Sequence, residues 1–156
     1  MDEILLDTSY LLPIFGMKLE YRDFEATFAK LLEKYAVRYN PVSLIEAKWI
    51  TLRLSRKSQD QRETLLQAYR VGLISLQEDK RLQKTVLTNG TIEELSDSLL
   101  TQQNLADYFD RQIYSTAVYL ESILLTEDEK LYELFKMRGN QYKPRQMMKW
   151  KELLGK

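Results

Sequence analysis

The sequence has 156 residues, of which 44% are hydrophobic, so residues 1–156 can bury the core of a single globular domain. It contains no histidine and no cysteine. Their absence excludes Ser-His-Asp and Cys-His triads, disulfide frameworks and the usual zinc and haem sites. Ionisable chemistry must rest on Asp, Glu, Lys, Arg and Tyr, and a metal site would use oxygen ligands, which favour Mg²⁺ or Mn²⁺.

The 23 basic and 23 acidic residues balance overall but are unevenly distributed. Residues 77–133 hold 12 acidic and 5 basic residues, whereas residues 136–156 hold 7 basic and 1 acidic and residues 48–70 hold 6 basic and 2 acidic. Zero net charge therefore does not exclude a nucleic-acid partner, although solvated helix faces give the same pattern. No apolar run is long enough to span a membrane, and the acidic start differs from a secretion signal, so we expect a cytoplasmic protein.

The first half of the chain alternates short apolar runs with amphipathic segments. Residues 3–6 form an apolar run closed by Asp7, Thr8 and Ser9, which indicates a buried strand followed by a helix start. Asn40 and Pro41 end a second such run. We predict strands over residues 3–6, 36–39 and 72–76, and helices over residues 21–35, 43–56 and 59–69.

The second half continues this alternation. Thr91 and Glu94 have the spacing of a helix-capping pair. We predict helices over residues 91–100, 102–119 and 127–137, and strands over residues 122–126 and 146–150. The alternation indicates an α/β fold with a parallel sheet, in which ligands lie beyond the carboxyl ends of the strands. Asp7 and Asp128 follow the first and fourth predicted strands and lie in that position.

Four carboxylates stand out by their positions, and each also has a simpler interpretation. Asp7 and Asp128 end strands, but either can be only a helix cap. Glu46 lies in the first turns of a helix, where the helix dipole alone favours a glutamate. Asp110 precedes the fourth strand and can simply be exposed beside Arg111. Their joint arrangement along the chain favours a shared role.

Taken in order, these segments resemble the PIN-domain family of small Mg²⁺- or Mn²⁺-dependent ribonucleases. The family pattern has a strand-ending Asp with Thr and Ser, an S-x-x-E helix, an Asp three residues before Ile or Leu in an alanine-rich helix, and a strand-ending T-x-D. The matching residues are Asp7, Ser43 with Glu46, Asp110 with Ile113 and Ala117, and Thr126 with Asp128. The helix after Asp110 is less alanine-rich than usual, and Asp107 is a nearby rival.

The resemblance implies a three-layer α/β/α sandwich with a mainly parallel central sheet of about five strands. It also implies that Asp7, Glu46, Asp110 and Asp128 hold or orient Mg²⁺ or Mn²⁺. Crowded carboxylates repel one another, and a divalent cation relieves that repulsion and activates water to hydrolyse a phosphodiester. Ser9 and Thr126 would then hydrogen-bond to the carboxylates or to the scissile phosphate, unless they act only as caps.

An RNA substrate would need basic residues around this acidic centre. The candidates for these RNA contacts are Lys48, Arg53, Lys143, Arg145 and Lys149. Many members of the family are toxins held by a small antitoxin protein, and others process RNA; the sequence does not separate these roles. Homodimers are common in the family, so the apolar early segment either forms a dimer face or packs into the core. Its residues are Tyr10, Leu11, Leu12, Tyr21 and Phe24.

Two other functions are compatible with part of this pattern. One is a catalytically inactive PIN-like module that binds RNA or another protein, because the four acids can persist where the surrounding surface binds no substrate. The other is a phospho-acceptor receiver domain. A receiver expects paired acidic residues after the first strand, whereas Asp7 has no acidic neighbour, and it has no role for the Ser43–Glu46 segment.

Overall fold

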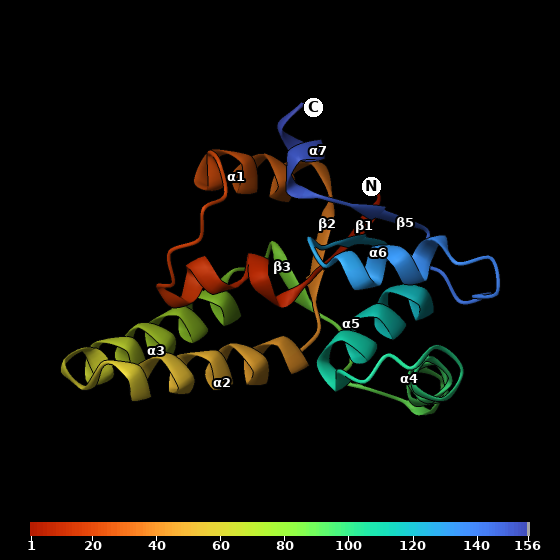
Figure 1. The fold of residues 1–156 in the computed structure, drawn as a ribbon. Helices are drawn as coiled ribbons and strands as arrows, with labels where there is room; N and C mark the ends of the chain where they lie inside the picture. The colour runs from red at the N-terminus through yellow and green to blue at the C-terminus, as the bar shows by residue number, and fades with distance from the viewer. Residues whose placement is uncertain (156) are drawn as a thin grey trace.

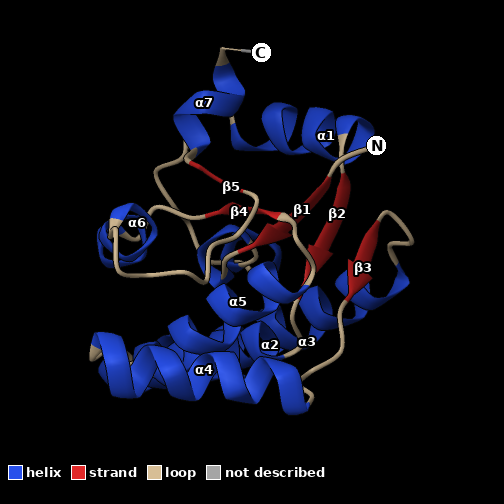
Figure 2. Ribbon diagram, turned by 90° about the vertical axis from the view of Figure 1, so that its right-hand side faces the viewer, coloured by secondary structure: helices blue, strands red, loops and turns tan. Residues whose placement is uncertain are grey.

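The computed structural model describes residues 1–155, with a five-stranded sheet at the centre (Figure 2). The strands run in the order β3-β2-β1-β4-β5, and every neighbouring pair is parallel. They are β1 (Glu3–Leu6), β2 (Ala36–Tyr39), β3 (Leu82–Lys84), β4 (Ile123–Leu125) and β5 (Gln146–Met148). This arrangement confirms the predicted α/β class and the parallel sheet.

Helices connect the strands, and the pair α2 and α3 forms an antiparallel hairpin that extends from the body of the molecule (Figure 1). The α-helices are α1 (Phe24–Lys34), α2 (Val42–Lys57), α3 (Arg62–Glu78), α4 (Gly90–Gln103), α5 (Tyr108–Tyr119), α6 (Glu129–Lys136) and α7 (Trp150–Leu154). Short 3₁₀ segments are η1 (Thr8–Tyr10), η2 (Leu12–Phe15) and η3 (Gln59–Gln61). Within the described residues, no helix combines the length and apolar character that crossing a bilayer requires.

The sheet buries both faces because its side chains alternate between two apolar clusters. Ile4 and Leu6 of β1 join one cluster, and Leu5 between them joins the other. The first cluster includes side chains of α1, α3 and α7, such as Leu31, Leu76 and Trp150. The second includes side chains of α4, α5 and α6, such as Leu99, Ile113 and Leu131. Helices therefore cover both faces, which confirms the three-layer α/β/α sandwich.

The predicted strand over residues 72–76 is wrong, because this segment lies inside α3. Its apolar residues follow a helical period: Gly72 and Leu76 are buried, whereas Ile74 between them is 56% exposed. The third strand is β3 instead, and only Leu82 of its three residues is buried. An edge strand this short and polar has no apolar run to reveal it.

The start of the helix predicted over residues 102–119 is wrong, because residues 102–103 are the end of α4 and a turn separates them from α5. α4 ends at Asn104, which adopts a left-handed conformation with φ of 55°, and α5 begins after Asp107, whose side chain caps it. The capping pair that begins with Thr91 is also wrong, because the side chain of Asn89 caps α4. The turn between the helices matters because it places Asp107 at the start of α5.

The apolar early segment packs into the interior of the chain. Tyr10 and Leu11 are fully buried, and Leu12 is nearly so. Tyr21 and Phe24 pack against the same cluster, and the ring centroids of Tyr10 and Tyr21 lie 5.1 Å apart. Tyr10, Leu11 and Leu12 therefore pack into the core and do not form a dimer face.

Candidate active site

Asp7 and Asp128 meet at one edge of the sheet because they follow the adjacent parallel strands β1 and β4. Asp7 Oδ1 accepts a hydrogen bond from the Thr8 N–H at 2.7 Å, and its Oδ2 accepts one from Thr126 Oγ1 at 2.5 Å. The same Thr126 oxygen accepts a hydrogen bond from the Asp128 N–H at 3.1 Å. Thr126 therefore links the two aspartates and fixes the orientation of the Asp7 carboxylate.

Glu46 reaches the same edge from the first turns of α2. Thr8 Oγ1 donates a hydrogen bond to Glu46 Oε2 at 2.6 Å and lies 2.9 Å from Ser43 Oγ. The S-x-x-E spacing puts Ser43 and Glu46 on one face of the helix, so both contact the segment that follows β1. Because Thr8 directly follows Asp7 in the chain, its hydrogen bond to Glu46 holds Glu46 in a fixed position relative to Asp7.

Asn40 explains why α2 begins where it does. It is completely buried between β2 and α2. Its Oδ1 accepts a hydrogen bond from the Val42 N–H at 2.8 Å, and its Nδ2 donates to Thr116 Oγ1 on α5, also at 2.8 Å. The start of α2 is thereby joined to α5, so the helices that carry Glu46 and Asp110 are held in a fixed relation.

Asp107 and Asp110 come from the start of α5. Asp107 Oδ1 accepts a hydrogen bond from the Asp110 N–H at 3.1 Å. The preceding turn is held by Arg111, whose buried guanidinium donates to the carbonyl oxygens of Leu105 at 2.9 Å and Ala106 at 2.6 Å. Asp107 and Asp110 therefore lie side by side, so Asp107 is a second carboxylate beside Asp110 and not a replacement for it.

Five carboxylates therefore form one negatively charged cluster: Asp7, Glu46, Asp107, Asp110 and Asp128. Burial, which has the largest effect, and the charges of Asp107, Asp7, Asp128 and Glu46 together raise the pKa of Asp110 to about 7. Burial likewise raises the pKa of Asp7 and of Glu46, and neighbouring acids add to both shifts. None of the ion pairs within residues 1–155 involves any of the five. The cluster therefore attracts cations.

The donor set fits Mg²⁺ or Mn²⁺ because it contains only oxygen atoms and carries excess negative charge. Among residues 1–155, no three acidic side chains already stand in a geometry that would hold a metal ion. Mg²⁺ does not require such a cage, since it binds through one or two carboxylates and keeps several waters. Asp7, Glu46, Asp110 and Asp128, with Asp107, are the residues that would hold or orient the ion.

Asp128 also has the simpler role of a helix cap. Its Oδ1 accepts hydrogen bonds from the backbone N–H groups of Lys130 at 2.8 Å and Leu131 at 3.1 Å. Its Oδ2 takes part in no hydrogen bond within the described part of the chain, so capping leaves one oxygen free. The cap therefore orients the Asp128 carboxylate and leaves its Oδ2 available for a metal ion.

Sequence reasoning missed Thr8, the residue that contacts Glu46. Ser9 was expected to support the carboxylates, but within residues 1–155 the side-chain hydrogen bonds to Asp7 and Glu46 come from Thr126 and Thr8 and not from Ser9. Thr8 and Ser9 differ by one position in a 3₁₀ turn, so they point in different directions. The two hydroxyl residues after Asp7 indicate that this turn hydrogen-bonds to the carboxylates, but the sequence does not show which of the two hydroxyls does so.

Glu127 is a second residue that sequence reasoning missed. Its Oε1 accepts hydrogen bonds from the Tyr10 hydroxyl at 2.9 Å and from the Trp150 N–H at 2.8 Å. Glu127 lies between Thr126 and Asp128, so it ties the loop that carries both to the start of α7. Its partners are distant in sequence, and no local pattern predicts such a contact.

Three of the basic residues predicted to contact RNA lie on elements next to the acidic edge. Lys48 follows Glu46 on α2, and its Nζ lies 4.8 Å from the centroid of the Tyr69 ring. Arg53 is exposed further along α2. Lys149 follows β5 and forms an ion pair with Glu129 in the first turn of α6.

The other two precede β5 and therefore lie toward the opposite edge of the sheet. Lys143 Nζ lies 5.6 Å from the centroid of the Phe135 ring near the end of α6. Arg145 Nη1 lies 2.8 Å from Asp2 Oδ1, just before β1 begins. The structure does not bring Arg145 to the acidic cluster.

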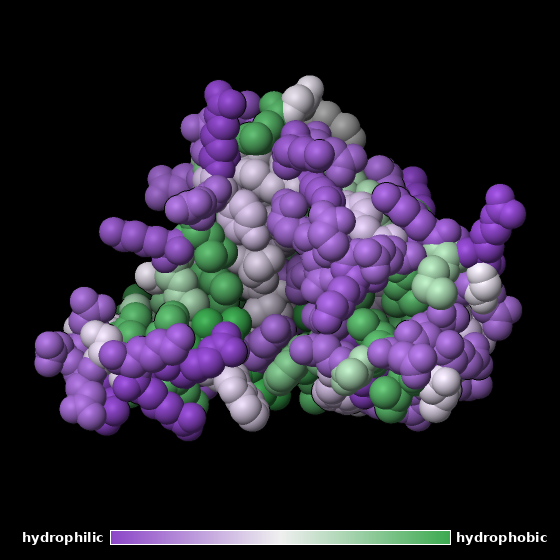
Figure 3. All heavy atoms as spheres, viewed as in Figure 1, coloured by the Kyte–Doolittle hydropathy of each residue, from purple (hydrophilic) through white to green (hydrophobic). Residues whose placement is uncertain are grey.

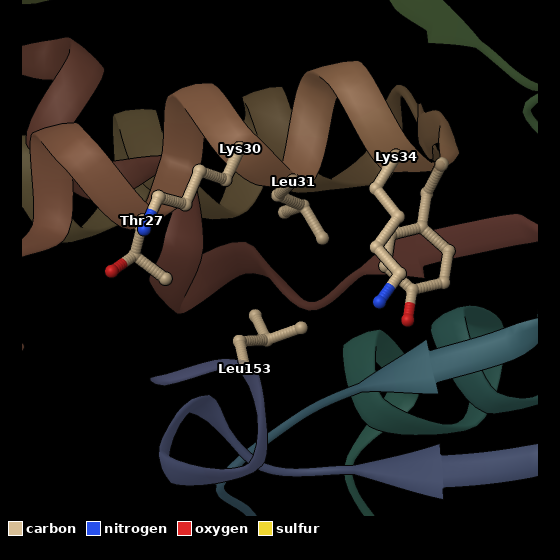
Figure 4. Close-up of a pocket in the computed structure, with 6 residues that line it drawn as sticks. Thr27, Lys30, Leu31, Lys34 and Leu153 are labelled. Carbon is tan, nitrogen blue, oxygen red and sulfur yellow. The ribbon is translucent and has the colours of Figure 1, made fainter. Parts of the chain in front are cut away.

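Two cavities differ in their relation to this cluster. A cavity of about 490 Å³ is lined by Asp107 and Asp110 and continues along α6. A second, of about 50 Å³, lies between α1 and α7, with Leu31 and Leu153 facing each other and Lys30 on α1 (Figure 4). The second is much smaller and is lined by none of the acids, so the first is the one that belongs with the candidate site.

Comparisons with solved structures show a similar fold in several other proteins. VapBC2 from Rickettsia felis, bound to a promoter DNA fragment, matches with a TM-score of 0.63 and 15% identity over 95% of this chain and 98% of that chain. FitAB bound to the IR36 DNA fragment matches with a TM-score of 0.53 and 15% identity over 94% of each chain. A Klebsiella pneumoniae toxin–antitoxin complex matches with a TM-score of 0.51 and 17% identity, over 81% of this chain and 88% of that chain.

The sequence itself identifies the family. No curated protein sequence matches the chain. Residues 4–136 match the family model described as PIN domain, and this range contains Asp7, Glu46, Asp110 and Asp128. Since the match covers most of the chain, and the sheet order and the acidic edge agree with it, the protein belongs to the PIN domain family.

Proposed function

We propose that this protein is an endoribonuclease that depends on Mg²⁺ or Mn²⁺ and acts through its acidic cluster. The observation that carries the proposal is the convergence of five unpaired carboxylates at the carboxyl edge of the sheet. They come from the turn after β1, from α2, from the start of α5 and from the loop after β4. Membership of the PIN family supports nuclease chemistry, and open parallel α/β sheets generally bind ligands at this edge.

The residues around the cluster would orient the carboxylates and the substrate. Thr126 and the Thr8 N–H hold Asp7 through both of its oxygens, and Thr8 holds Glu46. A divalent cation, when bound, supplies positive charge that polarises the phosphodiester and lowers the pKa of an attacking water. Rigid support of this kind keeps reacting groups in place without reorganisation. No histidine is required, and the sequence has none.

The proposed substrate is RNA, approached by basic side chains beside the acidic edge. Lys48 and Arg53 on α2 and Lys149 after β5 would contact phosphates, whereas Lys143 and Arg145 precede β5 and lie toward the other edge of the sheet. Such contacts bring a polyanion to a centre that would otherwise repel it. Aromatic side chains can stack on unpaired bases, which favours single-stranded regions.

We further propose that the protein is the toxin of a toxin–antitoxin pair, because one of the structures with a similar fold is described as a toxin–antitoxin complex. The α2–α3 hairpin exposes apolar side chains that an antitoxin segment would cover. In the view of Figure 3, hydrophobic residues gather along the upper side of the hairpin region, and hydrophilic residues line its lower side. Trp49 is 64% exposed and Ile45 is 55% exposed, and both line a groove of about 400 Å³ with Tyr69 and Leu73. Apolar exposure of this kind marks interaction sites.

The nuclease proposal is tested with purified protein and a single-stranded RNA oligonucleotide. Cleavage should require Mg²⁺ or Mn²⁺, stop with EDTA, and return when excess metal is added. A DNA oligonucleotide of the same sequence tests the preference for RNA. Cleavage that continues in EDTA would contradict the metal-dependent mechanism, and stable RNA binding without cleavage in either metal would identify an inactive PIN-like module.

The toxin proposal is tested by inducible expression in a bacterial host. Expression should arrest growth, and co-expression of a small protein encoded beside this gene should relieve the arrest. The variant Trp49→Ala should retain RNA cleavage but lose this relief, with Val71→Ala on the exposed side of α3 as the matched control. The mass of the purified complex would also show whether the toxin is a homodimer.

A further inference from the structure

The cavity beside the acidic cluster has the composition of a binding pocket. It measures about 490 Å³ and lies between the α4–α5 turn and α6. Leu105, Leu134 and Met137 give it apolar walls, and Asp107 and Asp110 stand at the end shared with the candidate site. A cavity of a few hundred Å³ with apolar walls and a few polar groups is typical of a site for a small organic ligand.

Four polar side chains line this cavity without hydrogen-bond partners of their own. Within residues 1–155, no hydrogen bond or ion pair engages the side chains of Gln103, Asn104, Lys130 or Glu133, although all four line the cavity. Together they present amide donors and acceptors, an ammonium donor and a carboxylate acceptor. Such a mixture matches the edge of a heterocycle rather than a purely anionic or purely apolar ligand.

We propose that this cavity is a subsite for one unpaired nucleobase of the RNA, next to the phosphate cleaved at the acidic cluster. The inference rests on the proposed nuclease function, because Asp107 and Asp110 belong to both places. Sequence-selective RNA recognition places unstacked bases against apolar surfaces and reads their edges with hydrogen bonds. The exposed Met137 provides the apolar surface, and Lys130 can contact the adjoining phosphate.

The charge of the cavity determines which bases it accepts. Glu133 accepts hydrogen bonds only, so it favours a base with an exocyclic amino group: adenine, cytosine or guanine. Uracil has no exocyclic amino group: its O4 and O2 repel a carboxylate, and only its ring N3–H can donate to one. The subsite should therefore disfavour uracil by about five- to tenfold, the net contribution of one ordinary hydrogen bond.

The test measures RNA binding by fluorescence anisotropy in the cleavage-blocked variant Asp7→Asn with Mg²⁺ present. Four single-stranded oligonucleotides differ only in the base beside the cleavage position, and this position is first mapped with the wild-type protein. If the wild-type protein does not cleave RNA, homopolymers of each base are used instead. Glu133→Gln should remove most of the discrimination against uracil. Met137→Ala should weaken binding of all four bases alike, by about threefold to tenfold. The matched controls are Glu94→Gln and Leu100→Ala, both exposed on α4 and outside the cavity.

The outcomes separate this inference from the proposed nuclease function. Unchanged base preference and unchanged affinity in both cavity variants would overturn the subsite, even if the wild-type protein cleaves RNA. Base-dependent binding that Glu133→Gln abolishes would support the subsite, even if the wild-type protein cleaves nothing and the nuclease proposal fails. Absence of any RNA binding would contradict both.

Discussion

Burial and the crowded carboxylates raise the pKa of Asp110 and thereby make the stability of the folded protein depend on pH. Its pKa of about 7 lies above the ordinary value of 3.8, so ionisation is less favourable in the folded chain than in the unfolded one. The resulting destabilisation is fully present above about pH 7 and absent below about pH 4. In the absence of a divalent cation, the folded protein should therefore lose stability as pH rises through this window.

Replacing Asp110 with asparagine should remove this penalty. In EDTA at pH 8, Asp110→Asn should be more stable than wild type by roughly 1 kcal/mol, reduced from the full pKa difference because the group is partly exposed to solvent. That gain corresponds to about 2–4 °C in melting temperature and should shrink at pH 5. Thermal unfolding at both pH values measures it, with exposed Asp97→Asn as the control. Equal melting temperatures at pH 8 would show that Asp110 is not strained by its neighbours.

At the scale of elements, the site depends on contacts between segments that are far apart in sequence. Glu127 joins the loop after β4 to η1 and α7, and Asn40 joins the start of α2 to α5. The sequence predicts β1, β2 and β4 because each is a short apolar run closed by polar residues. It does not predict β3, since this edge strand has one buried residue, or the end of α4 at Asn104, since that turn contains neither glycine nor proline.

Gly72 shows why the apolar run in α3 is a helix packed closely against η2. A Cβ at this position would lie 2.3 Å from the Ile14 carbonyl oxygen, which is backbone and cannot move aside. Gly72→Ala should therefore destabilise the protein by about 2–3 kcal/mol, or roughly 4–12 °C. Gly90→Ala is the matched control, because a Cβ there meets nothing within 4 Å. Similar melting temperatures for the two variants would contradict the close approach of α3 to η2.

At the scale of the whole molecule, the sheet topology gathers the acids that the sequence indicates one by one. Asp7 and Asp128 can be predicted to meet, since each follows a strand of a parallel sheet. The contribution of Asp107 could not be separated from that of Asp110, because the choice depends on a turn held by the buried Arg111. The choice of Thr8 over Ser9 depends on the direction of a 3₁₀ turn, which the sequence does not fix.

The distribution of basic residues across the molecule gives a prediction about salt. Each phosphate contact with single-stranded RNA contributes about −0.7 to the slope of log affinity against log salt concentration. Replacing Lys48 and Arg53 together with glutamine should flatten the slope by up to roughly 1.4. Arg145→Gln should leave it unchanged, because this residue pairs with Asp2 toward the other edge of the sheet. A larger change in Arg145→Gln than in the double variant would move the RNA path away from α2.

The most direct test of the acidic centre compares RNA cleavage by the wild-type protein and Asp7→Asn in saturating Mn²⁺. Asp7 is held through both oxygens, so the substitution alters charge with little change in shape. The wild-type protein should cleave the RNA, and Asp7→Asn should be slower by more than about 100-fold, the upper range for residues that only support a metal site. Thermal unfolding would confirm that the variant is folded. Equal rates in two separately purified preparations would contradict the assignment of nuclease activity to this cluster.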